Sequence, residues 1–270
     1  MITSASNSRI KHVTNLISSK KERVASSAYV VEGIKLFMEA PIQDIEEVYI
    51  SESFEERLCG GDENKLSGAM VELYKKLKDT GYDVVSDQIF KKMSDTVTPQ
   101  GILCTIHITP AKLDNVLNEY EGKTFRAIAL EGLQDPGNMG TIVRTAEAAG
   151  VNLILAGLNT VDVYSSKVVR STMGSLFRVP IVYSQDLYED IELLKNRNIK
   201  VYAAHLKGVD SYRDVKYGDR SLILIGNEGN GLTDTATGLA DTLVRIPMEG
   251  KVESLNAAVA AAILMFEVGR

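Results

Sequence analysis

Three stretches of the sequence combine glycine with amide, acidic, hydroxyl and basic side chains, the groups that bind and orient a polar ligand. EGLQDPGNMGTIVRTAEAAG (residues 131–150) contains Asn138 and Arg144, and LILIGNEGNGL (residues 222–232) contains Glu228. VRIPMEGKVESLNAAVAAAILMFE (residues 244–267) contains Ser254 and Asn256. Each stretch follows a run typical of a β-strand. Because open α/β sheets bind ligands at the carboxyl ends of their strands, we expect all three to lie near one site.

The residues within the first two stretches predict their local shape. Asp135-Pro136-Gly137 favours a turn, after which Asn138 can cap a helix that carries Arg144 about two turns further on. A lone arginine in such a place is more often an ordinary surface residue. The glycines of residues 226–231 allow a sharp bend, but the order is neither that of a P-loop nor GxGxxG. This loop alone fits a simple turn as well as a ligand cradle.

Alternating strand-like and helix-like segments supply the elements that must position these loops. Strands are predicted at residues 28–33, 45–50, 82–86, 101–108, 125–133, 152–157, 179–184, 200–206, 221–229 and 243–248. Helices are predicted at residues 64–79, 138–150, 164–177, 186–198 and from about residue 257 onward. This alternation favours an α/β protein with mostly parallel sheets. We expect a small domain at residues 1–107, a polar linker at 108–124, and a second domain at 125–270.

The apolar run from Ala257 to Phe266 predicts a helix without a polar face, capped by Ser254 or Asn256. It is far shorter than the roughly 20 residues that cross a bilayer. A helix that is apolar all round must be buried all round, but a sheet covers one side only. A central position inside one chain is one solution; we favour a second copy of the chain, and hence a homodimer.

Composition and charge limit the class of protein. The net charge of −6 argues against a protein that coats nucleic acid through bulk charge. The polar, basic start of the chain does not resemble a secretory signal. Cys59 and Cys104 have no metal or redox spacing and fit reduced thiols, so we expect a cytoplasmic protein that is not bound to a membrane. His12, His107 and His205 are far apart in sequence, and we expect no metal.

Taken together, in this order and spacing, the three stretches resemble the three signature motifs of the SpoU (TrmH) RNA 2′-O-ribose methyltransferases of the SPOUT superfamily. The resemblance covers roughly residues 120–270. It implies a mostly parallel sheet with helices on both faces, a carboxyl-terminal trefoil knot, and a dimer packed through helices that include the final one. It also implies S-adenosylmethionine as the cofactor, held bent by the knotted loops.

The resemblance also implies roles for individual residues. The candidate catalytic residues are Arg144, Asn138, Glu228, Ser254 and Asn256. The candidate cofactor-binding residues are Leu206, Gly226, Asn227, Gly229, Ile246, Met248 and Leu255. A guanidinium has a pKa above 12, so we expect Arg144 to orient the ribose and stabilise alkoxide charge rather than act as a base.

The first half of the chain, with NSRIKHV, VEGIKLFMEA and MSDTVTPQGILC, looks like the substrate-binding domain often attached in this family. That domain is similar to ribosomal proteins that grip kinked RNA. Five cations and one acid lie in the first 25 residues: Arg9, Lys11, Lys20, Lys21, Arg23 and Glu22. Arg9, Lys11 and Arg170 are the candidate RNA-binding residues, although a solvated helix face explains the basic run equally well.

Other functions remain open at this point. The two-domain layout favours ribosomal RNA as the substrate, with transfer RNA as the alternative. A binding-only RNA module of the same fold is a second alternative, against which the complete motif set argues. A nucleotide-dependent dehydrogenase would need GxGxxG between a first strand and helix, and the sequence has no such segment.

Overall fold

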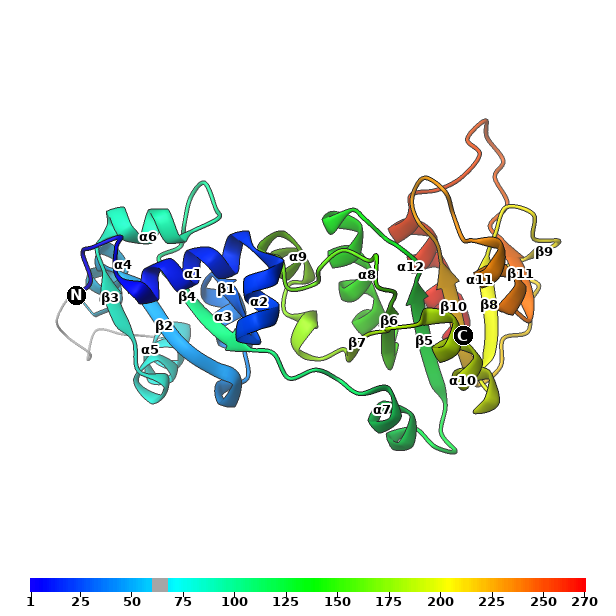
Figure 1. The fold of residues 1–270 in the computed structure, drawn as a ribbon, viewed down its shortest axis with the longest axis horizontal. Helices are drawn as coiled ribbons and strands as arrows, with labels where there is room; N and C mark the ends of the chain where they lie inside the picture. Colours follow the sequence, from blue (N-terminus) through cyan, green and yellow to red (C-terminus); the bar gives the residue numbers. More distant parts are fainter. Residues whose placement is uncertain (60–67) are drawn as a thin grey trace. The chain divides into compact units, whose positions relative to one another are not determined.

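The computed structural model describes residues 1–59 and 68–270, apart from the Cys59 side chain, and divides into two compact units. The first unit comprises Met1–Thr109 together with Tyr164–Phe177, and the second comprises Pro110–Val163 and Arg178–Arg270 (Figure 1). The sequence did not predict that residues 164–177 would pack with the first unit. The predicted helix at 64–79 falls partly outside the described residues.

The first unit is built on a four-stranded sheet in the order β1-β4-β2-β3. The strands are β1 (Ala28–Glu32), β2 (Ile45–Ser51), β3 (Asp83–Val85) and β4 (Ile102–His107). β4 runs antiparallel to both β1 and β2, whereas β2 and β3 are parallel. The prediction of a mostly parallel sheet is therefore wrong for this unit. β1, β2 and β3 run in one direction, as helical connections require, but β4 enters between β1 and β2 in reverse.

Helices cover both faces of this sheet, because its strands alternate apolar side chains between the two faces. Val30, Tyr49 and Leu103 pack into one core, whereas their neighbours Val31, Ile50 and Cys104 pack into another. The helices are α1 (Ser8–Ser18), α2 (Lys20–Ser26), α3 (Ile34–Glu39), α4 (Glu52–Cys59), α5 (Ala69–Thr80), α6 (Asp87–Met93) and α9 (Ser166–Thr172), with 3₁₀ turns at Ile42–Asp44 and Ser175–Phe177. Burial raises the pKa of Cys104 to about 12, which keeps this residue a thiol.

The second unit is built on a seven-stranded sheet in the order β7-β6-β5-β10-β8-β11-β9, in which every pair is parallel. Its strands are β5 (Phe125–Leu130), β6 (Leu153–Ala156), β7 (Ile181–Tyr183), β8 (Lys200–Ala204), β9 (Asp210–Ser211), β10 (Arg220–Ile225) and β11 (Thr242–Arg245). The predicted parallel α/β fold is confirmed here. β5, β10, β8 and β11 are neighbours, so the loops at their carboxyl ends lie along one edge.

Helices pack on both faces of this second sheet. Side chains of α7 (Leu113–Glu119), α10 (Leu187–Asn196) and α11 (Asp234–Leu239) share one core with alternate residues of β5 and β10. α8 (Pro136–Ala148) packs against α12 (Ala257–Val268), which also contacts β10, and neither contributes to that core. α7 lies within the predicted linker, but its Val116 and Leu117 are buried in the second unit. The connection is therefore partly folded onto that unit.

α12 is packed within the chain on one side only. Ala261, Leu264 and Met265 are buried, but Val259 is 48% and Phe266 is 55% exposed. A central position with burial all round inside one chain is therefore not what the structure has. Across the described residues, no helix is both long and apolar enough to span a bilayer.

Candidate active site

The amino-terminal end of α8 is capped by Asp135, whose carboxylate accepts a hydrogen bond of 2.8 Å from the Asn138 backbone N–H. The prediction that Asn138 caps this helix is wrong. Pro136 takes the first helical position, where a missing N–H costs nothing, and so the cap falls on the preceding residue. Asn138 lies inside the helix, 8% exposed, with its side-chain amide available for contacts outside the helix.

Glu228, in the loop after β10, binds the beginning of the first stretch. Its Oε1 accepts hydrogen bonds of 2.9 Å from Asn138 Nδ2 and from the Asp135 N–H, and its Oε2 accepts one of 3.0 Å from the Gln134 N–H. Limited burial acts to raise the pKa of Glu228, but these three hydrogen bonds outweigh it and hold the pKa below its usual value. The carboxylate is therefore ionised and its acceptor sites are largely used.

Asn256 joins the third stretch to the other two. Its Nδ2 donates a hydrogen bond of 2.8 Å to Asn138 Oδ1. Its own Oδ1 accepts from Ala258 N–H at 2.9 Å and from Val259 N–H at 3.3 Å, which makes Asn256 the cap of α12. Of the two predicted caps, the structure thus selects Asn256. A continuous chain of hydrogen bonds, Glu228–Asn138–Asn256, connects all three stretches.

A second acid at the same edge was missed in the sequence. Glu131, the first residue after β5, accepts hydrogen bonds of 2.7 Å from the hydroxyls of Thr233 and Tyr188, and one of 2.8 Å from the Thr233 N–H. It thereby ties the loop after β5 to the beginning of α11. Its place directly after a buried strand was the available signal, since a carboxylate there needs hydrogen-bonding partners.

A pocket of about 380 Å³ opens between the loops that follow β8, β10 and β11 and the beginning of α12. All seven predicted cofactor residues line it, together with two predicted catalytic residues: Leu206, Gly226, Asn227, Gly229, Ile246, Met248 and Leu255, with Glu228 and Ser254. The other three predicted catalytic residues, Asn138, Arg144 and Asn256, are not among the described residues that form the pocket wall. The structure thus gathers nine of the twelve predicted catalytic and cofactor-binding residues around one cavity.

Glycine is required at one point of the pocket wall. A Cβ atom on Gly226 would lie 2.1 Å from the backbone carbonyl carbon of Gly231 and 2.3 Å from the Leu232 nitrogen. The loop after β10 therefore closes directly onto this residue. The Asn227 side chain fixes the bend, because its Oδ1 accepts from the N–H groups of Gly229 and Asn230.

Arg144 lies on α8 with its side chain exposed. It has no hydrogen-bond or ion-pair partner within residues 1–59 and 68–270. An exposed guanidinium without a protein partner is available to an anionic or hydroxyl-bearing ligand. The described part of the chain also holds no group of three or more His, Cys, Asp or Glu side chains placed to bind a metal ion.

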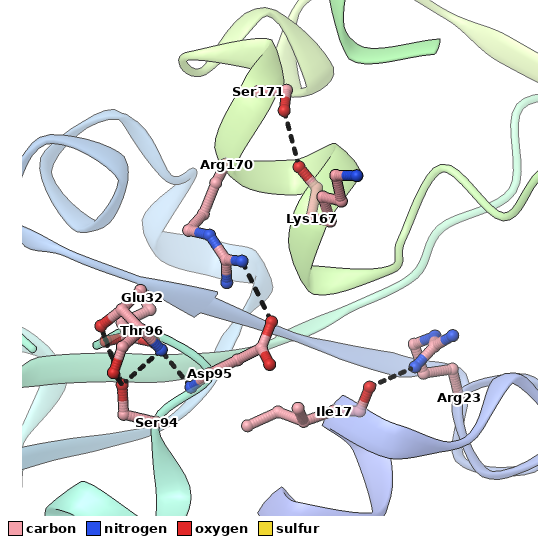
Figure 2. A network of polar contacts seen from close by, with 9 residues as sticks. All are labelled: Ile17, Arg23, Glu32, Ser94, Asp95, Thr96, Lys167, Arg170 and Ser171. Atoms are coloured by element: carbon pink, nitrogen blue, oxygen red, sulfur yellow. Dashed lines mark hydrogen bonds and ion pairs between the residues drawn. The ribbon is translucent and has the colours of Figure 1, made fainter. Parts of the chain in front are cut away.

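The three candidate RNA-binding residues are placed differently from one another. Arg9 forms ion pairs with Glu47 at 2.8 Å and with Asp83 at 2.7 Å, and Arg170 Nη2 pairs with Asp95 at 3.0 Å (Figure 2). The side chain of Lys11 is exposed and has no partner in the described part of the chain. The positive charges of Arg9 and Arg170 are thus already compensated within the first unit.

The predicted basic run is further reduced by Arg23. This residue is only 5% exposed, and its Nη1 donates to the Leu16 carbonyl at the end of α1. The same nitrogen donates to the Ile17 carbonyl (Figure 2). It belongs to the fold of the first unit rather than to an RNA-facing arm. The number of basic residues in a sequence does not show which guanidinium groups bind carbonyls at a helix end and which face solvent.

The SpoU rRNA Methylase family matches residues 126–266 of the chain, slightly more than half of it. This chain belongs to that family. The MRM3-like substrate binding domain matches residues 7–104 of this SpoU methylase. The membership confirms the predicted family, the α/β fold of the second unit, and the predicted class of enzyme, an RNA methyltransferase dependent on S-adenosylmethionine.

Individual relatives cover almost the whole SpoU methylase chain. A Bacillus subtilis protein named 23S rRNA (guanosine(2553)-2′-O)-methyltransferase RlmP is 30% identical over 99% of this chain and 98% of its own. An AdoMet-bound rRNA methyltransferase from Sinorhizobium meliloti has 28% identity and a TM-score of 0.81, covering 99% of this chain and 96% of its own. AviRb from Streptomyces viridochromogenes, with AdoMet, has a TM-score of 0.81 at 24% identity over 97% of this chain and 98% of its own, which supports the fold alone.

Proposed function

We propose that this SpoU methylase transfers a methyl group from S-adenosylmethionine to a ribose 2′-hydroxyl of ribosomal RNA. The observation that carries the proposal is the chain Glu228–Asn138–Asn256, which joins the three motif loops beside a pocket of cofactor size. The choice of ribosomal RNA is supported by the name of the B. subtilis relative, which matches over nearly the full length of both chains.

The pocket fits the proposed cofactor in size and chemistry. Its volume of about 380 Å³ lies within the usual range for small-molecule sites. Leu206, Ile246 and Leu255 supply apolar wall for an adenine ring, and Gly226 lets backbone groups approach closely. When bound, S-adenosylmethionine supplies an electrophilic methyl group on a positively charged sulfur. The residues of the chain have only to position that group and the hydroxyl in line.

Arg144 is the residue we assign to the ribose. A guanidinium does not lose its proton in proteins, so Arg144 donates hydrogen bonds to the 2′-oxygen and stabilises negative charge that develops there. Asn138, Glu228 and Asn256 have their polar atoms engaged with one another or with the backbone. We therefore infer that they position the motif loops, while Ser254, at the pocket wall, is free to contact ligand.

The first unit is proposed to bind the RNA, with residues 1–107 as its main part, 108–124 as the connection, and residues 125–270 apart from 164–177 as the catalytic domain. The match to a substrate binding domain supports this division. Lys11 is the best-placed of the candidate cations, because Arg9 and Arg170 would each have to exchange an acidic partner for a phosphate.

We also propose that the enzyme is a cytoplasmic homodimer with a trefoil knot in the second unit. The uncovered side of α12, with Val259 and Phe266, supports a second copy as its cover. Phe266→Glu should give a monomer in sedimentation, whereas Val209→Glu, at an 88% exposed site elsewhere in the unit, should not. Equal dimer content in both variants, or a monomeric parent protein, would rule out this interface.

Mapping of 2′-O-methyl groups tests the activity itself. The protein, labelled S-adenosylmethionine and either ribosomal or transfer RNA should give label in ribosomal RNA at one ribose. Arg144→Ala should abolish transfer and leave cofactor affinity within a few-fold. Lys200→Ala, which removes an exposed charge at the opposite edge of the sheet, is the matched control. Label in transfer RNA alone would select the alternative substrate, and full activity of Arg144→Ala would remove Arg144 from the mechanism.

A further inference from the structure

The residues that line the pocket also include three basic ones outside those assigned so far. His205 and Lys207 follow β8, and Arg245 is the final residue of β11, the neighbouring strand. All three line the pocket. They lie on the side away from β5, whereas Glu228 follows β10 on the other side of β8.

The hydrogen bonds of His205 define which of its ring nitrogens can act on a ligand. Its Nδ1 accepts a hydrogen bond of 3.1 Å from the Lys207 N–H, and so the proton of the neutral ring lies on Nε2. Its backbone is fixed too, because the N–H donates to the Val244 carbonyl at 3.0 Å. Nε2 has no partner among the described residues. It is therefore a hydrogen-bond donor, and in this tautomer it cannot accept a proton from a ribose.

Lys207 and Arg245 add positive charge at the same place. Both side chains are exposed, and neither has an ion-pair partner in the described ranges. The loop after β8 touches β11, since a Cβ on Gly208 would lie 3.0 Å from the Arg245 nitrogen. The acid across the pocket, Glu228, is already occupied by three donors. The β8–β11 side is thus an electropositive donor surface whose two cations have no carboxylate partner in the described part of the chain.

We propose that His205, Lys207 and Arg245 form the subsite for the carboxylate of the amino-acid part of S-adenosylmethionine, a proposal that rests on the cofactor pocket described above. The carboxylate is the only anionic group of that cofactor. Its sulfonium and ammonium groups are cationic and disfavour this side of the pocket. A donor on His205 and two uncompensated cations match a carboxylate better than any other part of the ligand.

Calorimetry with two ligands tests the subsite. S-adenosylhomocysteine carries the carboxylate, and its decarboxylated analogue differs only by its loss. The parent protein should bind S-adenosylhomocysteine roughly tenfold or more tightly than the analogue, since charge-assisted hydrogen bonds are lost. The double variant Lys207→Ala/Arg245→Ala should lose most of this preference, while its affinity for the analogue stays equal or rises slightly. Lys200→Ala should behave like the parent.

Two substitutions of His205 separate its ligand contact from its local one. Gln places a donor near the position of Nε2, whereas Asn places an acceptor near that of Nδ1. We expect His205→Gln to retain much of the preference for the carboxylate, and His205→Asn and His205→Ala to lose it. Retention by Asn and loss by Gln would show that His205 only fixes the turn and would overturn its assignment.

The remaining outcomes are also decisive. Equal losses for both ligands in the double variant, or an undiminished preference, would overturn the subsite. An undiminished preference with weaker RNA binding would assign the two cations to RNA instead. If the parent protein bound neither ligand, the cofactor pocket itself would be refuted, and the subsite with it, whereas failure of the subsite alone leaves cofactor binding by the parent intact.

Discussion

Selected cations of the two units are used in opposite ways. In the first unit, Arg9, Arg23 and Arg170 bind acids or helix-end carbonyls of the same unit, so the charges of these three arginines are used internally. At the carboxyl edge of the second unit, Arg144 and the pocket cations have no partner in the described part of the chain, and the amides and acids join loops instead. The comparison shows that uncompensated charge, rather than the number of cations, indicates where a ligand binds.

Removal of the first unit should have the largest effect, and it tests whether the second unit is stable alone. Deleting residues 1–110 would leave α9 without the core in which Val169 is 1% exposed. We expect the shortened chain to be poorly soluble and to bind a hydrophobic dye, because Tyr164, Leu176 and Phe177 lose their cover as well. Replacing Val169 and Phe177 with serine in the same deletion should restore solubility. A soluble deletion protein with unchanged cofactor affinity would mean that residues 164–177 need no partner.

The polar chain of the second unit should be more sensitive than any ion pair of the first. Asn138→Ala removes two partly buried side-chain hydrogen bonds, each of which contributes about 0.5–1.5 kcal/mol to the free energy of unfolding. Asn138→Asp should cost more, because its carboxylate faces Glu228. Denaturant titration and cofactor titration should both register the loss. A change below about 0.5 kcal/mol in both variants would show that the loops hold together without this residue.

The contribution of Glu228 to the stability of the second unit should depend on pH. Its pKa in the folded protein lies below the ordinary value of 4.5, so its contribution to stability is present above that value and is lost as pH falls through the folded pKa. The Tm difference between the parent protein and Glu228→Gln should be constant near neutral pH and shrink below about pH 4.5. A difference that grows on acidification would contradict the assigned ionised state.

The smallest expected effects separate compensated from free cations in the first unit. Lys11→Ala should weaken RNA binding and reduce the salt slope by about one. Arg9→Ala should change RNA affinity less, because Glu47 and Asp83 already hold that guanidinium, and its stability cost should stay within about 1 kcal/mol. RNA titrations at several salt concentrations measure both. A larger loss of RNA affinity for Arg9→Ala than for Lys11→Ala would show that the paired arginine, and not the free lysine, binds the RNA.

Much of the second unit could be predicted from sequence because its signals are local. The buried strands β5 and β10 are rich in apolar residues, and the loops after them must lie on one edge of a parallel sheet. The contact of Asn138 with Glu228 and Asn256 could not be predicted, since an asparagine near a helix start suits a cap equally well. Which core receives Val169 was equally hidden, because a helix pattern shows that a face is apolar but not what covers it.

Because residues 164–177 belong to the first unit, this unit is not one continuous amino-terminal segment of the chain. The chain passes between the units three times, at residues 109–110, 163–164 and 177–178. A single recombination near residue 110 between two related genes would exchange most of the first unit. It would combine the four-stranded sheet of one parent with α9 of the other. A functional chimera therefore requires two transplanted segments, and the two stretches of gene are expected to change together as such enzymes diverge.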